Sequence, residues 1–126
     1  MKKLAIIALT ALIAAPTTGF AGMLGTGSTF AGVGDDATCF LSNLGSGNLK
    51  IDNVRLLDAA GDPASANLSS TTCGPMLAPG GTCFLSKTLD AGQTVRCQFD
   101  IKGSASKARG SMTLSGAGGT ETFDAH

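Results

Sequence analysis

The sequence contains no tryptophan and no tyrosine, and its single histidine, His126, is the last residue. Carbohydrate-binding modules stack sugars on exposed tryptophan and tyrosine rings, so this composition argues against a sugar-binding module. A catalytic triad needs a histidine held beside a nucleophile, whereas terminal residues are usually mobile. We therefore expect no triad of the serine-hydrolase kind in this chain.

Charge is also scarce, because only 14% of the residues are charged and no run of basic residues occurs. A nucleic-acid-binding protein normally carries a basic patch or stripe, and an anionic membrane surface attracts the same feature. The sequence therefore predicts neither nucleic acid nor an anionic membrane as a partner.

One long hydrophobic run is present, and it lies at the N-terminus. Lys2 and Lys3 precede the uncharged run Leu4–Ala15, and Pro16 follows it. Gly19-Phe20-Ala21 then places small residues at the two positions that a signal peptidase reads. The run is shorter than the roughly 20 residues that span a bilayer. We expect residues 1–21 to be a signal peptide, a periplasmic or secreted location, and no membrane span after cleavage.

Cleavage after Ala21 would leave 105 of the 126 residues, which is the size of one domain. Loss of Lys2 and Lys3 lowers the basic count from 9 to 7 against 9 acidic residues, so the net charge becomes −2. We expect residues 22–36 to be a glycine-rich, flexible N-terminal segment and residues 37–126 to form the folded domain.

Four cysteines follow the predicted cleavage site: Cys39, Cys73, Cys83 and Cys97. An even number of cysteines in an exported chain predicts disulfides, because the periplasm and the exterior are oxidising. A zinc site would have to use four scattered thiols, and the C-x-x-C spacing of redox and zinc sites is missing. Four cysteines allow three pairings, and their spacing alone leaves all three open.

Alternation of apolar and polar residues dominates the chain after residue 37, whereas the 3.6-residue period of a helix does not occur. Val95, Cys97, Phe99 and Ile101 alternate with polar residues, which predicts a half-buried strand. Turn residues recur roughly every 8 to 12 residues, as in all-β sandwiches and barrels. The residues expected to face inward are Phe40, Leu41, Leu49, Ile51, Val54, Leu56, Leu85, Val95, Phe99, Ile101, Met112, Leu114 and Phe123.

Two local patterns predict specific backbone features. Ile51 and Val54 belong to the same apolar stripe although they are three residues apart, which indicates a β-bulge or bend at Asp52-Asn53. Turn residues fill positions 90–93, between two strand patterns, and predict a hairpin there.

The pentapeptide Thr-Cys-Phe-Leu-Ser occurs twice, at residues 38–42 and 82–86. Each copy precedes a glycine-containing turn and an alternating strand. The similarity fades beyond the five residues. We therefore interpret the copies as two strands in like environments rather than as a duplicated hairpin.

Patterns that could carry chemistry are weak. Ser104 and Lys107 match the S-x-x-K spacing of penicillin-binding enzymes, but they lie in a predicted polar turn and lack the S-D-N and K-T-G partners. Asp35-Asp36 and the Asp58/Asp62 turn do not follow the spacing of a calcium-binding EF-hand. The sequence therefore predicts no catalytic residue, no metal and no cofactor.

Residues 73–83, Cys-Gly-Pro-Met-Leu-Ala-Pro-Gly-Gly-Thr-Cys, resemble a segment of bacterial exported immunoglobulin-like domains of the abnormal-spindle/hydin type. In those domains a Leu-x-Pro-Gly turn separates two cysteines. Residues 38–48, with the pattern Cys39-x-x-x-Asn43-x-Gly45, look like an early strand and turn of the same family.

The resemblance implies a small immunoglobulin-like antiparallel β-sandwich of about seven strands over residues 37–126. It also implies that Cys73 pairs with Cys83. The remaining bond, Cys39–Cys97, would then link strands distant in sequence, as the inter-sheet bond of an immunoglobulin domain does.

These observations support three functional hypotheses. The first is a non-catalytic exported domain that binds an unknown protein, or itself, in an envelope assembly. The second is a pilin-like or surface-fibre subunit, in which residues 22–34 would add a strand to a neighbour's sheet. The third is a small secreted hydrolase, for which Ser106 is the residue to test.

Overall fold

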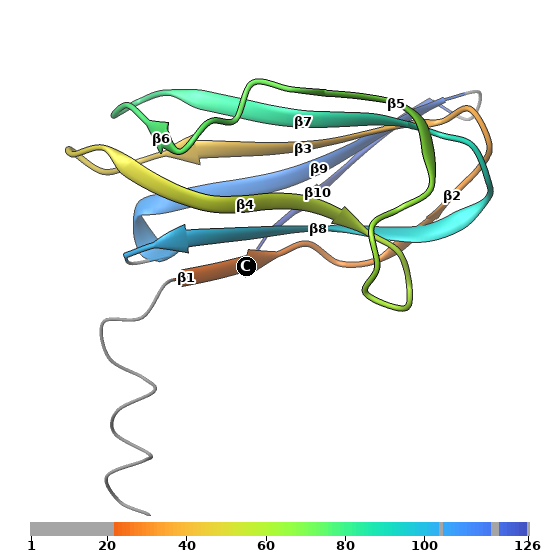
Figure 1. Cartoon of the computed structure of the whole chain (residues 1–126), viewed down its shortest axis with the longest axis horizontal. Coiled ribbons are helices and arrows are strands. Elements are labelled where there is room, and N and C mark those ends of the chain that lie inside the picture. Colours follow the sequence, from red (N-terminus) through yellow and green to blue (C-terminus); the bar gives the residue numbers. More distant parts are fainter. Residues whose placement is uncertain (1–21, 104, 117–118, 126) are drawn as a thin grey trace, which may run out of the picture.

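A computed structural model describes residues 22–103, 105–116 and 119–125, and most of them lie in strands (Figure 1). The predicted signal peptide and His126 lie outside the described residues. No helix in this part of the chain is long and apolar enough to cross a membrane. The elements are β1 (Gly22–Gly25), β2 (Thr29–Ala31), β3 (Asp36–Asn43), β4 (Leu49–Leu57), β5 (Ala66–Thr71), β6 (Met76–Leu77), β7 (Thr82–Leu89), β8 (Gln93–Lys102), the 3₁₀-helix η2 (Ala105–Lys107), β9 (Ala108–Gly116) and β10 (Gly119–Asp124).

The strands form two antiparallel sheets (Figure 1). One sheet has the order β1-β8-β4-β6, with β2 also paired to β8, and is called the β8 sheet below. The other has the order β10-β9-β3-β7-β5 and is called the β3 sheet. The prediction of an all-β fold is therefore confirmed, and the two sheets are consistent with a β-sandwich.

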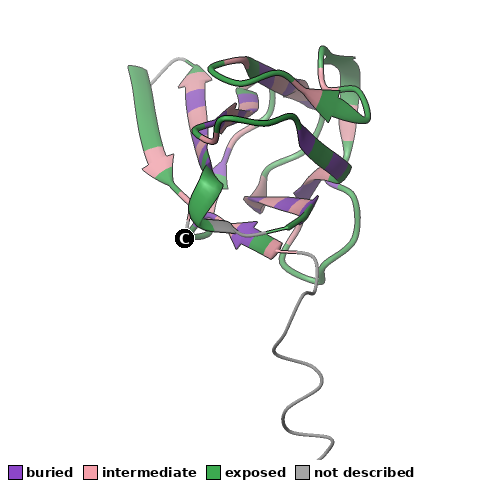
Figure 2. Cartoon of the chain, turned by 90° about the vertical axis from the view of Figure 1, so that its left-hand side faces the viewer, coloured by how far each residue is buried: buried purple, intermediate pink, exposed green. Residues whose placement is uncertain are grey.

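Alternate residues of each long strand are buried between the sheets, which gives the strands the striped pattern of Figure 2. On β8, Val95, Cys97, Phe99 and Ile101 are fully buried, as their alternation predicts. Phe40, by contrast, does not join the core. Successive side chains of a strand point to opposite faces, so the buried neighbours of Phe40 on β3 force its ring outward.

The connections between strands differ from the sequence prediction at residues 90–93. From β2 to β9, each successive strand lies in the opposite sheet. β7 ends at Leu89 in the β3 sheet and β8 begins at Gln93 in the β8 sheet, so the segment between them crosses the sandwich and is not a hairpin. The prediction was wrong because both edges of β7 are already paired, with β3 and with β5.

The predicted bulge in β4 is confirmed. The register with β8 shifts between Ile51 and Asn53, where the paired residue changes from Ile101 to Asp100. The extra residue restores the inward direction of the apolar stripe, so that Leu56 is buried like Ile51.

The segment 22–36 is not a flexible lead-in, which corrects the sequence expectation. β1 and β2 both pair with β8 and bury Leu24 and Ala31, which are 6% and 1% exposed. Glycine-rich composition favours flexibility, but β8 is a long strand whose free edge offers backbone hydrogen bonds to any extended segment. A bridge between Thr26 and Ala125 also joins this segment to the chain end beyond β10.

Asn43, which belongs to the pattern of the family resemblance, joins the loop after β3 to strand β6. It is only 2% exposed. Its Nδ2 donates to the carbonyl oxygens of Gly47 (2.8 Å) and Leu77 (2.9 Å), and its Oδ1 accepts from the amide of Gly45 (2.9 Å). A buried amide with three such bonds has a structural role, because each bond gives a polar group that is shielded from water a hydrogen-bond partner within the protein.

Candidate functional site

The two copies of Thr-Cys-Phe-Leu-Ser lie side by side in the β3 sheet. The strands that contain them, β3 and β7, run antiparallel with Phe40 opposite Phe84. The first residue of each copy therefore faces the last residue of the other. Identical sequences in this arrangement are related by a local two-fold axis that passes between the two phenylalanines.

This register gathers six side chains on the outside of the sheet. The rings of Phe40 and Phe84 pack in a tilted pair with centroids 6.2 Å apart. A hydroxyl pair flanks the rings on each side, Thr38 with Ser86 (3.1 Å) and Ser42 with Thr82 (2.8 Å). We call this surface the hydroxyl face; it comprises Thr38, Phe40, Ser42, Thr82, Phe84 and Ser86.

Strands on both sides of β3 and β7 add further hydroxyl side chains to this face. Ser111 and Thr113 on β9 lie beside Phe40 and Thr38, and Thr122 on β10 lies beside Thr113. On the other side, Ser70 of β5 lies beside Ser86. Hydroxyl side chains thus extend from the aromatic pair across all five strands. Charged residues lie at the margins of the same face, with Arg109 beside Ser42, Asp124 beside Ser111 and Asp36 beside Thr88.

A shallow depression of about 360 Å³ adjoins the hydroxyl face between β5 and β7. Leu68, Ser70, Ser86 and Thr88 line it together with Ser69, and the Leu68 side chain is 68% exposed. The surface therefore combines two half-buried rings, one exposed aliphatic side chain and many hydroxyl groups. The aromatic pair is the feature that this surface shares with the cores of protein interfaces, where aromatic residues are enriched.

The outer face of the β8 sheet has the opposite chemistry. Arg55 Nη2 donates to Asp100 Oδ2 at 2.8 Å across β4 and β8. Gln98 donates to Asp100 and accepts from Arg96, so the four side chains form a polar chain across the sheet. Because these charged groups are hydrogen-bonded to one another, they have fewer donors and acceptors left for a binding partner.

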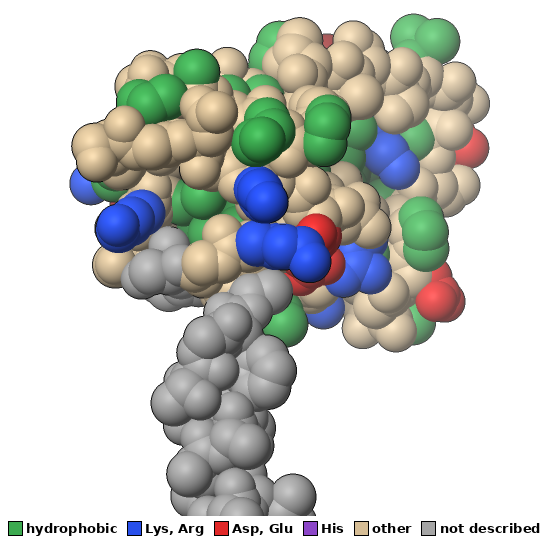
Figure 3. All heavy atoms as spheres, turned by 60° about the vertical axis from the view of Figure 1, so that its left-hand side comes forward, with side chains coloured by type: hydrophobic (Ala, Val, Ile, Leu, Met, Phe, Trp, Pro, Cys, Tyr) green, Lys and Arg blue, Asp and Glu red, His purple; other side chains and the backbone are tan. Residues whose placement is uncertain are grey.

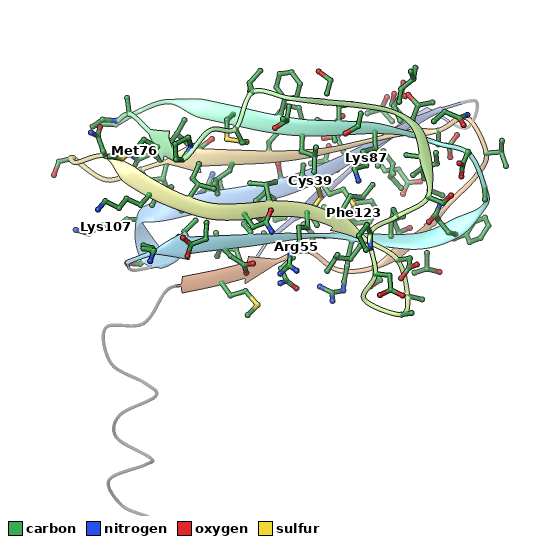
Figure 4. All side chains as sticks on the ribbon, viewed as in Figure 1. Cys39, Arg55, Met76, Lys87, Lys107 and Phe123 are labelled. Atoms are coloured by element: carbon green, nitrogen blue, oxygen red, sulfur yellow. A yellow bond between two sulfur atoms is a disulfide. The ribbon has the colours of Figure 1, made fainter. Side chains whose placement is uncertain are left out.

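The four cysteines form two disulfides that support the strands of the hydroxyl face. Cys39–Cys97 joins β3 to β8 through the middle of the core (Figure 4), with Cα atoms 5.8 Å apart. Cys73–Cys83 joins the segment after β5 to β7, with Cα atoms 4.9 Å apart. Each bond thus begins or ends next to Phe40 or Phe84 in the sequence. Two disulfides suggest an oxidising, extracytoplasmic environment.

The residues considered for chemistry are scattered. Lys107 lies in η2, at one end of the sandwich, whereas Ser104 is outside the described residues. Asp58 Oδ1 accepts from the amides of Ala60 and Asp62, which makes it a turn-stabilising side chain. Among the described residues, no cluster of three His, Cys, Asp or Glu could hold a metal ion.

Two further hollows lie away from the hydroxyl face. A groove of about 390 Å³ opens between β4 and the segment after β5, where Asn53 and Val54 face Thr71 and Cys73. A hollow of about 240 Å³ lies between the loop after β3 and the loop after β8, and its wall includes Lys102 and Lys107.

No protein-family model matches the chain, and no curated protein matches it. The affiliation with the abnormal-spindle/hydin type therefore stays a prediction from residues 38–48 and 73–83.

Sequence reasoning noticed the repeated pentapeptide but missed the surface that it builds. The signal was present in the sequence, because the first, third and fifth residues of each copy point to the same face of a strand, and these are two hydroxyl residues around one phenylalanine. If the two strands pair in antiparallel register with their central residues opposite each other, the two phenylalanines become neighbours.

Proposed function

We propose that this chain is an exported, non-catalytic domain of immunoglobulin-like type that binds another protein in the periplasm or outside the cell. The observation that carries this proposal is the hydroxyl face, with the Phe40–Phe84 pair at its centre and a hydroxyl pair on each side of it.

A protein is the class of partner that best suits this surface. Binding hot spots are commonly large side chains surrounded by residues that exclude water. Phe40 and Phe84 are suited to be the large central side chains. The paired hydroxyl groups are suited to be the surrounding residues, because hydroxyl groups that are already hydrogen-bonded to each other cost little to remove from water. The shallow depression beside Leu68 suits a partner side chain rather than a whole small molecule.

Export rests on the leader pattern of residues 1–21 and on the two disulfides. It is tested by the intact mass, without reductant, of the protein recovered from separated periplasm and medium of its native host. We expect the mass of residues 22–126 less four hydrogens. A mass that retains residues 1–21, or four free thiols, would refute the export argument.

Binding through the hydroxyl face is tested by site-specific crosslinking in the native host. A photoreactive phenylalanine analogue at position 40 keeps an aromatic ring on the surface and reports what touches it. Met23 is the matched control position, since its side chain is 62% exposed on the β8 sheet. We expect a discrete protein adduct from position 40, no such adduct from position 23, and a lower yield when Phe84→Ser is added.

Absence of any adduct from position 40, or equal adducts from both positions, would contradict the proposal. An adduct between two copies of this chain would still support binding through the face, with self-association as its form.

A second candidate function, a structural subunit of a surface fibre, is favoured by a different observation. The loops at one end of the sandwich contain no acidic residue and the loops at the other end contain no basic residue, which suits end-to-end contact between copies. The strand-donor role considered for residues 22–34 is less suitable, because β1 and β2 pair with β8 of their own chain.

A further inference from the structure

The sandwich is elongated, and its strands run along the long axis so that the connecting loops gather at two ends (Figure 1). One end holds the loops 44–48 and 72–81 and a third loop, of which residues 103 and 105–107 are described. The other end holds the loops 32–35, 58–65 and 90–92.

The first end, called the basic end, is free of acidic residues in its three loops. Lys107 lies within the third loop, and Lys50 and Lys102 lie at the adjoining ends of β4 and β8. Lys50 and Lys102 are direct cross-strand neighbours, and Asp52 Oδ1 lies 4.0 Å from Lys102 Nζ, so this end carries three lysines against one nearby carboxylate. Figure 3 shows several Lys and Arg side chains, with exposed hydrophobic side chains, when this end is turned forward.

The second end, called the acidic end, contains no lysine or arginine in its loops. Asp35, Asp58, Asp62 and Asp90 all lie in these loops, and Asp36 begins the adjoining strand β3. The Asp62 side chain is exposed, and Asp90 is bonded to the hydroxyl of Ser65 at the surface. The two ends of one molecule therefore carry opposite charge.

Exposed apolar side chains accompany the charge at both ends. Leu44 and Met76 are 58% and 50% exposed at the basic end, where Figure 4 shows Met76 at the same end as Lys107. Phe30 and Val33 are 69% and 70% exposed at the acidic end. Apolar side chains within a charged rim are the usual composition of a protein interface.

The shapes of the ends also suit each other. The basic end is hollowed by about 240 Å³ between its loops, with Lys102 and Lys107 in the wall. The acidic end carries the loop 58–65, which contains two carboxylates and no bulky side chain. A carboxylate from that loop would meet the ammonium group of Lys107 at the hollow, whereas Lys102 Nζ already lies 4.0 Å from Asp52 Oδ1 of its own chain.

We propose that the basic end of one copy of this chain docks onto the acidic end of the next. The occupant is a second copy, because the charge complement of each end is found on the opposite end of the same molecule. The contact is heterologous, and its two surfaces lie at opposite ends of the long axis. Such a contact does not close on itself and extends into a linear filament. No residue of the hydroxyl face takes part, so this contact leaves that face open for a different protein.

The experiment measures self-association of the purified protein by sedimentation velocity across a concentration series. We expect oligomers that grow with concentration at low salt. Screening shortens the Debye length from about 10 Å at 0.1 M salt to about 3 Å at 1 M, so we expect association to weaken roughly tenfold or more over that range. A protein that stays monomeric throughout, or whose association does not depend on salt, would overturn the proposal.

Charge reversal at each end provides a sharper test. The variant Lys50→Glu/Lys107→Glu removes the basic end, and the variant Asp62→Lys/Asp90→Lys removes the acidic end. Each variant alone is expected to be monomeric, but each keeps one working end. An equimolar mixture should therefore associate again, because the unaltered acidic end of one variant meets the unaltered basic end of the other and the two reversed ends also have opposite charge.

Thr122→Lys/Asp124→Lys is the control, because it raises the net charge by a similar amount on the edge strand β10, and it should associate like the unaltered protein. Circular dichroism and a non-reduced intact mass verify that each variant is folded with both disulfides. A mixture that stays monomeric, or variants that still form long oligomers alone, would refute end-to-end docking while leaving binding through the hydroxyl face untouched.

Discussion

Gly110 on β9 is the position at which the packing of this sandwich is most directly testable. It lies on the inner side of the strand, against the fully buried ring of Phe99 on β8. A Cβ atom at residue 110 would lie 2.6 Å from Phe99 Cε2, 2.9 Å from Phe99 Cδ2 and 3.0 Å from Ala125 Cβ. Cβ atoms essentially never approach other heavy atoms this closely, so Gly110→Ala must displace either the ring or the strand.

Overpacking of a filled core typically costs about 1–3 kcal/mol. For a domain of this size, 1 kcal/mol corresponds to roughly 4–8 °C in Tm, so Gly110→Ala is expected to lower Tm by roughly 4–24 °C. The assay is urea unfolding with the disulfides intact, because it reports the free energy and the m-value together. A matched control is Gly47→Ala, whose added methyl group would meet no atom within 4 Å.

Size compensation separates steric conflict from a general sensitivity of β9. Phe99→Leu alone should also destabilise the protein, because it leaves a cavity. In the double variant the added methyl group partly fills that cavity. The double variant should therefore lose less stability than the sum of the two single variants, by about 0.5–3 kcal/mol. If Gly110→Ala unfolds like the unaltered protein, or if the two costs simply add, the proposed packing of β8 against β9 is wrong.

The disulfides and the buried amide give further predictions. Replacing both Cys39 and Cys97 by alanine should destabilise the protein more than replacing Cys73 and Cys83, because sequence separations of 58 and 10 residues predict losses of about 4.2 and about 2.7 kcal/mol from loop closure. The midpoints of urea unfolding test the order, and equal or reversed midpoints would contradict it. Asn43→Ala should cost roughly 1–3 kcal/mol, since it leaves buried backbone groups without their partner. Amide hydrogen exchange should show the associated loss of protection in the loops after β3 and β6; unchanged protection would argue against the role given to this side chain.

The sequence was sufficient to predict the strands but not their neighbours. The alternation on β8 and the bulge in β4 were predictable, because side-chain direction follows from a period of two and from a single extra residue. The turn at residues 90–93 was misread as a hairpin, since the same turn residues suit a connection within a sheet and one between sheets. Only the pairing of β7 with β3 and β5 decides between them.

The pairing of the N-terminal segment could not be predicted from its sequence either. Its glycines and small residues predicted flexibility, and nothing within residues 22–36 indicates a partner strand. The free edge of β8 supplies that partner, and it lies about 70 residues further along the chain. Pairing that is distant in sequence can therefore order a segment whose own composition favours disorder.

The candidate surface depends on the same kind of long-range pairing. Each copy of Thr-Cys-Phe-Leu-Ser alone specifies only a strand with one cysteine and one leucine inward. The pairing of the two copies brings the rings of Phe40 and Phe84 together and doubles the hydroxyl groups around them. Because Cys39 bonds to Cys97 and Cys83 bonds to Cys73, each copy is also held covalently from its inner side. The disulfides thus lie directly beneath the surface proposed to bind, where rigid strands lower the entropy that a partner must overcome on binding. A surface that is held in one arrangement before the partner arrives binds with higher affinity. The same two disulfides therefore stabilise the strands β3 and β7 and prepare their outer face for binding.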